Sequence, residues 1–557
     1  MPEKRQILEK PCIYRKSIIK AYQSGGEKMK KKNSNILVIP TEKTEIGAGE
    51  FAGTTYKKVI IHGGVKSIGV SAFNAWTTEE VVFEEGIKNI PDGIFSHFTN
   101  LKKVSLPHGL ESIGNRAFYC SGIEEITIPD SVKEIGNEAF CGCVKLKKVV
   151  LSDKTVSYGA RAFEYVPMEG DIVFSDCVKE IGAEAFKGCK YITSVTFSKG
   201  LTSVEKELFK GCKSLCEVTL ADGIVTIKGE AFADTGIEKA DIPDSVKKIN
   251  AGAFSGCKKL KETTLSKNLK GIANRVYEDT AIVSVTIPDG VKSIGDCAFN
   301  GCGELVSVTL NNGLVSIGEK AFAGTGIEDI DVPETVTSIG ARAFIWCKAL
   351  RKFRFPEDMT VIAEGVLALS GIEEVYIPDT VTKIEREAFY RCERLTKVAL
   401  PLSLLTIGRS AFAYSAIVSV KIPSGTESVG EAAFQSCGEL KSAALPDGMQ
   451  KIPDEMFEYS GLETLDIPDS VTEIGDSTLY GTNISSVTFP EGLEVIKRNA
   501  LRRTQIREVT IPKTVRKIGS EAFYGCENLK KVKFEGNVEE IGHNAFAQIG
   551  GMEINIR

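Results

Sequence analysis

An aromatic residue recurs through almost the whole chain at a spacing that few folds can accommodate. Aligned on pairs such as Ala139-Phe140, the position occurs 23 times between Phe51 and Phe546, and each interval is 22 or 23 residues. A fixed period of this size is typical of repeat architectures, because one short repeat cannot bury its own apolar face whereas stacked repeats can. The period therefore predicts one continuous stack of coils rather than several globular domains.

Residues 123–140 show how one coil is expected to fold. Their first six residues predict a strand that buries Ile123, Ile126 and Ile128, because apolar and polar side chains separate onto opposite faces. Proline cannot donate to a strand ladder, so Pro129 ends the strand. The segment 137–140 predicts a short helical or 3₁₀ piece that places Phe140 inside the coil.

Repeats of two lengths alternate from Phe232 to Phe457, which gives a longer period of 45 residues. The shorter repeats carry glycine directly before their next apolar residue, as at Gly122, Gly326 and Gly461. We expect positive φ angles at these glycines, because a left-handed residue lets the chain turn in one fewer step.

The repeat resembles a known family. The segment Leu146-Lys-Lys-Val-Val-Leu151 matches the strand half of a leucine-rich repeat. The fuller pattern Ile-x-Ile-Pro-Asp-Ser-Val-x-x-Ile-Gly-x-x-Ala-Phe-x-x-Cys-x-x-Leu, seen at 126–146 and again at 287–305 and 377–395, is similar to BspA-like leucine-rich repeats of bacteria. The resemblance implies an α/β repeat fold, a right-handed solenoid of about 23 coils with a parallel sheet on its concave face.

Two regions of different composition divide the chain. Residues 1–33 hold ten Lys or Arg and three Glu, while the whole chain has 69 basic and 74 acidic residues. We interpret 1–35 as a basic, disordered tail or as residues upstream of a start at Met29, and 36–557 as the solenoid. Nucleic-acid binding by the tail is disfavoured, because few aromatic residues accompany its charges.

Cysteines form a structural column in the expected fold. Nine of the fifteen lie three residues after the repeat aromatic, and most are 45 residues apart. Two coils separate such cysteines by about 10 Å, too far for a disulfide. They are predicted to be mostly free, buried thiols. Only Cys189 and Cys212, in adjacent coils at the same position, are close enough on spacing to form a bridge. The column comprises Cys143, Cys189, Cys212, Cys257, Cys302, Cys347, Cys392, Cys437 and Cys526.

Signatures of catalysis or of metal binding are absent from the sequence. There is no Gly-rich phosphate loop and no nucleophile elbow, and the chain has four histidines. The Cys141/Cys143 pair has no second pair nearby, so the zinc signal is weak. Carboxylate pairs such as Glu124 and Glu125 are interpreted as a solvated strand face. We therefore predict a protein that is not an enzyme and has no catalytic residue, cofactor or metal.

An uncharged strip on the sheet is the candidate partner-binding surface. In register, Ser284 and Thr286 lie beside Ser307 and Thr309, and their low desolvation cost suits a protein or glycan of a host or neighbouring cell. By contrast, the basic triplet Arg351, Lys352 and Arg354 lies between acidic coils. It predicts a ladder of ion pairs rather than a nucleic-acid patch.

Two functions remain open at this point. The resemblance implies an adhesin-like or cell-surface interaction protein that uses its concave sheet face. The alternative is an intracellular scaffold of the same fold, which free thiols would suit because they persist in reducing compartments. No run of about 20 apolar residues that could span a membrane occurs, and no signal peptide is visible, so the location is left as unknown, with the cytoplasm one possibility.

Overall fold

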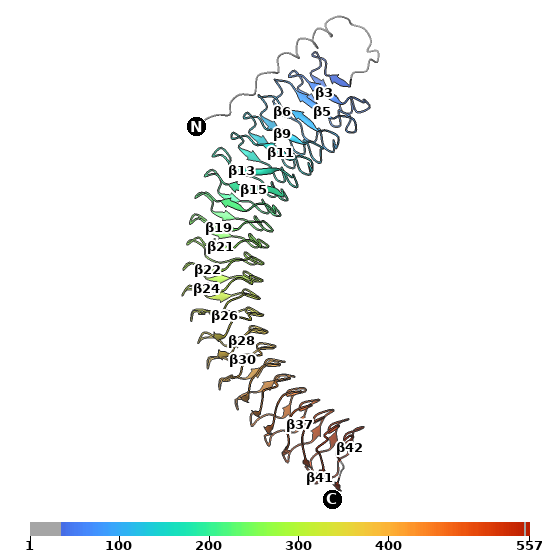
Figure 1. Ribbon diagram of the computed structural model, residues 1–557, viewed down its shortest axis with the longest axis vertical. Helices are drawn as coiled ribbons and strands as arrows, with labels where there is room; N and C mark the ends of the chain where they lie inside the picture. The colour runs from blue at the N-terminus through green and yellow to red at the C-terminus, as the bar shows by residue number, and fades with distance from the viewer. Residues whose placement is uncertain (1–34, 551–552, 557) are drawn as a thin grey trace.

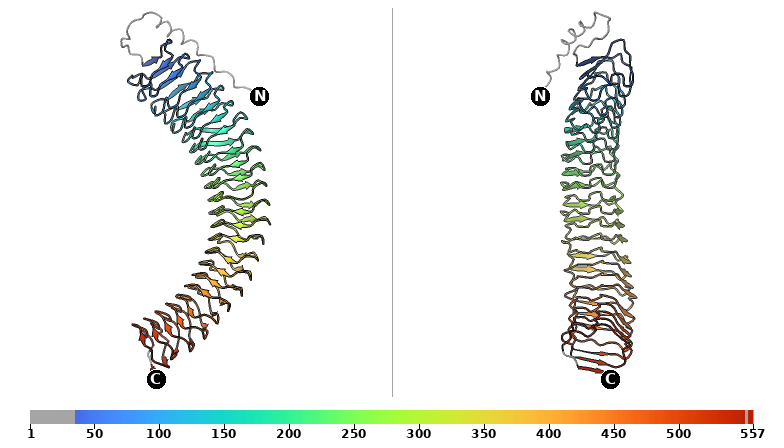
Figure 2. Two further views of the ribbon diagram at one scale, coloured as in Figure 1. Left: turned by 180° about the vertical axis from the view of Figure 1, so that it is seen from behind. Right: turned by 90° about the vertical axis from the view of Figure 1, so that its right-hand side faces the viewer.

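A computed structural model describes residues 35–550 and 553–556, so the predicted basic tail lies outside the described residues apart from residue 35. The chain winds into a curved solenoid of about 22 turns, with its first and last coils at opposite ends (Figures 1 and 2). All described strand pairs are parallel, and each joins one coil to the next. The expected single stack of coils is thereby confirmed.

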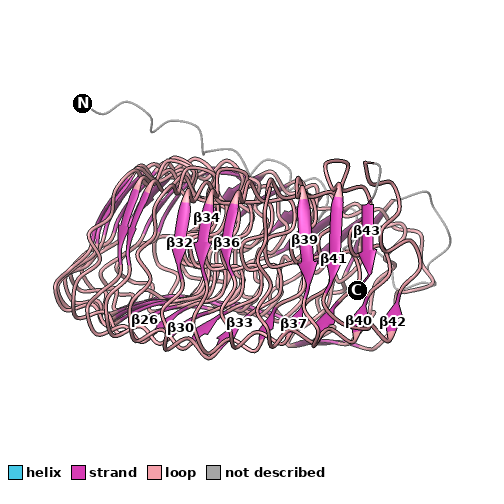
Figure 3. Cartoon of the chain, turned by 90° about the horizontal axis from the view of Figure 1, so that it is seen from below, coloured by secondary structure: helices cyan, strands magenta, loops and turns pink. Residues whose placement is uncertain are grey.

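Each regular coil contains a longer strand and, after a turn, a strand of two residues. Figure 3 shows the two kinds on different sides of the stack. The longer strands are β1 (Ile36–Val38), β3 (Lys58–Ile61), β5 (Glu80–Phe83), β7 (Lys103–Ser105), β9 (Glu125–Thr127), β11 (Lys148–Val150), β13 (Glu169–Val173), β15 (Tyr191–Thr196), β17 (Glu217–Thr219), β19 (Lys239–Asp241), β21 (Glu262–Thr264), β22 (Ser284–Thr286), β24 (Ser307–Thr309), β27 (Lys352–Arg354), β29 (Glu374–Tyr376), β32 (Ser419–Lys421), β34 (Ser442–Ala444), β36 (Thr464–Asp466), β39 (Glu508–Ile511), β41 (Lys531–Phe534) and β43 (Glu553–Ile556).

The strands of two residues pair among themselves in a separate set of short sheets. They are β2 (Glu45–Ile46), β4 (Ser67–Ile68), β6 (Asn89–Ile90), β8 (Ser112–Ile113), β10 (Glu134–Ile135), β12 (Ser157–Tyr158), β14 (Glu180–Ile181), β16 (Ser203–Val204), β18 (Thr226–Ile227), β20 (Lys248–Ile249), β23 (Ser293–Ile294), β25 (Ser316–Ile317), β26 (Ser338–Ile339), β28 (Val361–Ile362), β30 (Lys383–Ile384), β31 (Thr406–Ile407), β33 (Ser428–Val429), β35 (Lys451–Ile452), β37 (Glu473–Ile474), β38 (Val495–Ile496), β40 (Lys517–Ile518) and β42 (Glu540–Ile541).

The helical segment expected before each repeat aromatic is not formed, and the α part of the predicted α/β class is wrong for the described residues, which contain no helix. At 138–142 alternate N–H groups donate to the following coil, for example Glu138 N–H to Ala160 O at 2.8 Å and Phe140 N–H to Ala162 O at 2.8 Å. A helix needs these donors within its own segment. The residues two before and two after the aromatic are left-handed instead, as Glu138 (φ 54°) and Gly142 (φ 72°) illustrate.

The glycines of the shorter repeats are needed for a different reason from the one expected. Positive φ angles are not found at Gly122 or Gly461. A Cβ on Gly461 would lie 2.1 Å from the carbonyl oxygen of Gly438 in the preceding coil, so no side chain fits. The expectation was wrong because these positions are constrained by the approach of two backbones rather than by the turn itself.

The repeat aromatics form a column along the solenoid axis. Neighbouring rings lie 4.9–6.1 Å apart between centroids, and their planes differ by at most 16°, as between Phe254 and Tyr277 at 5.6 Å and 7°. Leucine replaces the ring at Leu367, Leu479 and Leu501, and these side chains are also buried. The inward assignment of this column is confirmed.

Replacing Phe254 by alanine tests how strongly the column stabilises the stack. We expect Phe254→Ala to lower the free energy of unfolding by about 3–5 kcal/mol, because the ring is buried between two neighbours and its removal leaves a cavity. Denaturant unfolding of both proteins measures the change. The control is Phe254→Leu, which reproduces the residue found at Leu367 and should cost about 1.5 kcal/mol or less. Equal midpoints for Phe254→Ala and the parent chain would contradict the assignment.

Candidate functional site

The four residues of the predicted strip lie together on the exposed face of β22 and β24. These strands pair in parallel with Ser284 opposite Ser307 and Thr286 opposite Thr309. Their side chains point outward while the intervening Val285 is buried, so the alternation of a strand presents all four hydroxyls on one face. The structure thus brings together the residues that the register predicted.

The hydroxyls of this strip are available to a ligand. Within the described chain none of the four makes a side-chain hydrogen bond. Elsewhere on the sheet comparable hydroxyls are occupied: Thr193 and Ser194 both donate to Asp171 at 2.7 Å. Val283 and Val306 lie at the start of the strip and are 42% and 44% exposed. The strip therefore offers free donors and acceptors beside apolar surface.

Charged coils border the strip on both sides. Glu262 is exposed on β21 before it, and Asp329 and Asp331 are exposed in the coil after it. A ligand seated on the hydroxyls need not desolvate a charge, whereas one reaching further along the sheet must do so. The change in polarity limits the strip to these two coils.

The basic triplet Arg351, Lys352 and Arg354 forms the predicted ladder of ion pairs with the following coil only. Lys352 Nζ lies 2.9 Å from Glu374, Arg351 pairs with Glu373 at 3.8 Å, and the Arg354 guanidinium lies 4.1 Å from the centre of the Tyr376 ring. On the other side the described residues show no ion pair between the triplet and the preceding acidic strand positions. Arg354 instead turns to Glu334 and Glu357 in the adjoining turns. These contacts satisfy the triplet internally, as expected of a structural ladder.

The column cysteines are free thiols with a hydrogen-bonding role. All fourteen cysteines in the described part of the chain are unbridged, Cys189 and Cys212 included. Each column thiol donates to the carbonyl of the aromatic position in the preceding coil, for instance Cys257 Sγ to Phe232 O at 3.0 Å. In the adjacent shorter repeat the equivalent residue is Thr235, whose hydroxyl donates to the same carbonyl at 2.9 Å. Sequence reasoning placed the thiols inside but missed this bond.

Burial suppresses ionisation of these thiols. It raises the pKa of Cys257 to about 11 and that of Cys212 to about 12, because a thiolate in the apolar column would lose its hydration. A reactive thiolate needs a lowered pKa, so the column is unsuited to nucleophilic chemistry.

Alkaline pH should destabilise the protein through this column. A thiol of the unfolded chain ionises near pH 8.5, whereas Cys257 in the native state keeps its proton to about pH 11. The contribution of Cys257 to stability is therefore complete below pH 8.5 and is lost as the pH rises from 8.5 to about 11. We expect the stability of the parent chain relative to Cys257→Thr to fall by about 2 kcal/mol between pH 7.5 and pH 10. Denaturant unfolding at both pH values measures it, and a constant difference would contradict the assignment.

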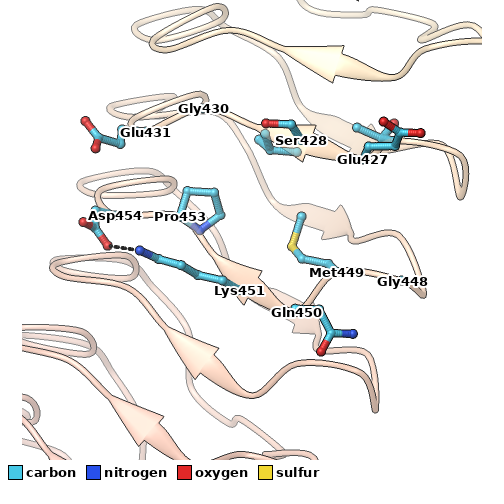
Figure 4. Close-up of a pocket in the computed structure, with 12 residues that line it drawn as sticks. Glu427, Ser428, Gly430, Glu431, Gly448, Met449, Gln450, Lys451, Pro453 and Asp454 are labelled. Atoms are coloured by element: carbon cyan, nitrogen blue, oxygen red, sulfur yellow. Dashed lines mark ion pairs between the residues drawn. The ribbon is translucent and has the colours of Figure 1, made fainter.

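A cavity of about 450 Å³ opens between the coils of β33 and β35 (Figure 4). In regular coils the residue after the short strand donates to the preceding coil, as Gly430 N–H does to Ile407 O at 2.8 Å. Pro453 occupies this position and has no N–H to donate, and β33 and β35 are not paired. At the edge of this cavity, Lys451 Nζ and Asp454 Oδ1 form an ion pair at 3.4 Å. A proline in the glycine position was the sequence signal for this opening, and it was missed.

A second hollow, of about 420 Å³, lies where the longer strands separate between β7 and β9. Only Lys103 and Glu125 pair between these strands, although β5 and β7 pair over three residues. His108 lies at its edge and is exposed, as is His97 elsewhere in this part of the chain. The described residues hold no group of three His, Cys, Asp or Glu side chains placed to bind a metal ion.

The repeated strand, turn and inward column define the class of this protein as a leucine-rich-repeat solenoid. A model of the BspA type leucine rich repeat region matches it in six copies, over 44–169, 113–207, 179–289, 270–396, 368–482 and 450–557. The chain belongs to this family, as its motifs suggested. The family consists of protein-interaction solenoids and is generally non-enzymatic.

Several solved structures are similar to this chain at low identity. A leucine-rich repeat protein from Bacteroides ovatus is 22% identical, with 76% of this chain and 82% of that one covered and a TM-score of 0.42. A leucine rich cell surface protein from Faecalibacterium prausnitzii is 22% identical over 78% and 88%, with a TM-score of 0.27. YopM from Yersinia enterocolitica is 12% identical over 86% and 91%, with a TM-score of 0.28.

The search of curated proteins gave no match to this chain. In the part of the chain that the structure describes, no helix has the length and apolar character needed to cross a membrane.

Proposed function

We propose that this protein is a non-enzymatic, adhesin-like interaction protein that binds a protein or glycan of a host or neighbouring cell through the concave face of its longer-strand sheet. The observation that carries the proposal is the strip of Ser284, Thr286, Ser307 and Thr309, whose hydroxyls are exposed and unused by the described chain. Long repeat stacks provide extended surfaces of this kind. Membership of the BspA type family supports the proposal.

The second candidate is an intracellular scaffold of the same fold. It is favoured by the fourteen unbridged cysteines of the described chain, since thiols persist in reducing compartments. Labelling intact source cells with a membrane-impermeant biotin reagent separates the two candidates. Labelled protein supports the adhesin-like function, and labelling only after lysis supports the scaffold.

Two arginines placed on the strip should weaken partner binding. We expect Ser284→Arg combined with Ser307→Arg to weaken binding at least ten-fold, because two cations would lie side by side where an uncharged ligand surface must dock. A partner isolated by pull-down from host or source extract provides the ligand, and its affinity for each variant is measured.

A matched pair of substitutions on the short strands controls for the added charge. Ser293 and Ser338 are exposed on β23 and β26, in nearby coils but away from the longer-strand face. Ser293→Arg with Ser338→Arg should leave the affinity unchanged. Undiminished binding by a folded Ser284→Arg, Ser307→Arg protein would remove the strip from the binding site.

A further inference from the structure

From His97 onward, the residue two positions after the repeat aromatic is left-handed, and its identity changes along the solenoid. In two middle coils it is Gly301 (φ 75°) and Gly324 (φ 67°). The next four coils place large side chains there instead. These residues are Trp346 (φ 63°), Leu369 (φ 59°), Arg391 (φ 54°) and Tyr414 (φ 60°).

Large side chains at this position oppose folding. A left-handed conformation is unfavourable for a residue other than glycine, and for a bulky residue it is an outlier. Trp346 is 54% exposed, so packing into the core does not offset this cost. Glycine in the two preceding coils shows that the turn needs no side chain here. Four successive coils thus carry large side chains that the turn does not need, and this clustering, which is absent around Tyr165 between Gly142 and Gly188, points to contact with another molecule.

A small apolar cluster separate from the main core underlies these residues. It consists of buried Ala323, Ile345 and Ala368, against which the partly buried Leu369 and Tyr390 pack. We name Trp346, Leu369, Tyr390, Arg391 and Tyr414 the turn ridge. Trp, Tyr and Arg are the residue types enriched at the energetic centres of protein interfaces.

Arg391 gives the turn ridge a charge preference. Its guanidinium lies 4.9 Å from the centre of the Tyr414 ring and 5.7 Å from that of Tyr390. The side chain is exposed and makes no ion pair with a described residue, whereas Arg386 and Arg394 in the same coil pair with Glu364 at 3.1 Å and Glu373 at 3.6 Å. A guanidinium held against aromatic rings with its donors free is arranged to receive a carboxylate.

We propose that the turn ridge is a second interaction surface, which binds a protein segment carrying a carboxylate next to an aliphatic or aromatic side chain. The carboxylate pairs with Arg391, and the apolar side chain packs on Trp346 and Leu369. This surface lies on the turns that follow the short strands, so it is separate from the Ser/Thr strip and does not depend on the function proposed for that strip.

A displayed library of random peptides, selected on the immobilised full chain, tests the proposal. We expect enrichment of sequences with Asp or Glu beside a large apolar residue. For a synthesised member of this set, Trp346→Gly and Arg391→Gly should each raise the dissociation constant at least ten-fold. Both should keep or raise the unfolding midpoint, because glycine relieves the left-handed strain. Loss of affinity without loss of stability separates binding from folding.

Tyr165 supplies the matched control. It is also left-handed (φ 61°) and 53% exposed at the same position of a distant coil. Tyr165→Gly should also keep or raise the unfolding midpoint, and it should leave the affinity for the peptide unchanged. The Ser284→Arg, Ser307→Arg protein should likewise bind the peptide normally. Absence of enrichment, selected peptides without acidic residues, or equal affinity for Trp346→Gly would overturn the proposal. Self-association that the ridge variants abolish would also overturn it, by assigning the surface to a second copy of this chain.

Discussion

Backbone hydrogen bonds between successive coils set a spacing to which every other feature of this structure conforms. The longer strands, the short strands and the turns each donate to a neighbouring coil, as Phe140 N–H does to Ala162 O at 2.8 Å. These bonds hold each coil at a nearly constant distance from the next. Ring columns then follow, because side chains at equivalent positions must lie about one coil rise apart.

The alternation of repeat lengths has a hydrogen-bonding counterpart in the core. A thiol in the longer repeat and a hydroxyl in the shorter one occupy the same column position, and Cys302 and Thr280 both donate to the carbonyl of Tyr277, at 3.0 and 2.9 Å. Because the two donors come from neighbouring coils and share one acceptor, the structural unit is a pair of coils, and a pair is 45 residues long. It also gives the cysteines a structural role, in keeping with the raised pKa of Cys302.

The outward surfaces of the solenoid differ in character from coil to coil. On the sheet face, Lys352 and Glu374 form an ion pair that neutralises both charges. The part of the face where Ser284 lies opposite Ser307 is uncharged. At the turn position two residues after the repeat aromatic, four successive coils from Trp346 to Tyr414 carry large side chains. Because the coils are nearly interchangeable in the core, their outward residues can differ without altering the fold.

The sequence alone determined the stack, its inward columns and the register that places Ser284 beside Ser307, because a strict period fixes which residues are equivalent. It did not determine the turn conformation: the pattern around Ala139-Phe140 suits a short helix until the next coil competes for its N–H groups. Gly461 was likewise recognised as special for the wrong reason, since the carbonyl that excludes its Cβ belongs to another coil. Contacts between coils are invisible within one repeat, and so the strained ridge at Trp346 and the opening at Pro453 became apparent only in the tertiary structure.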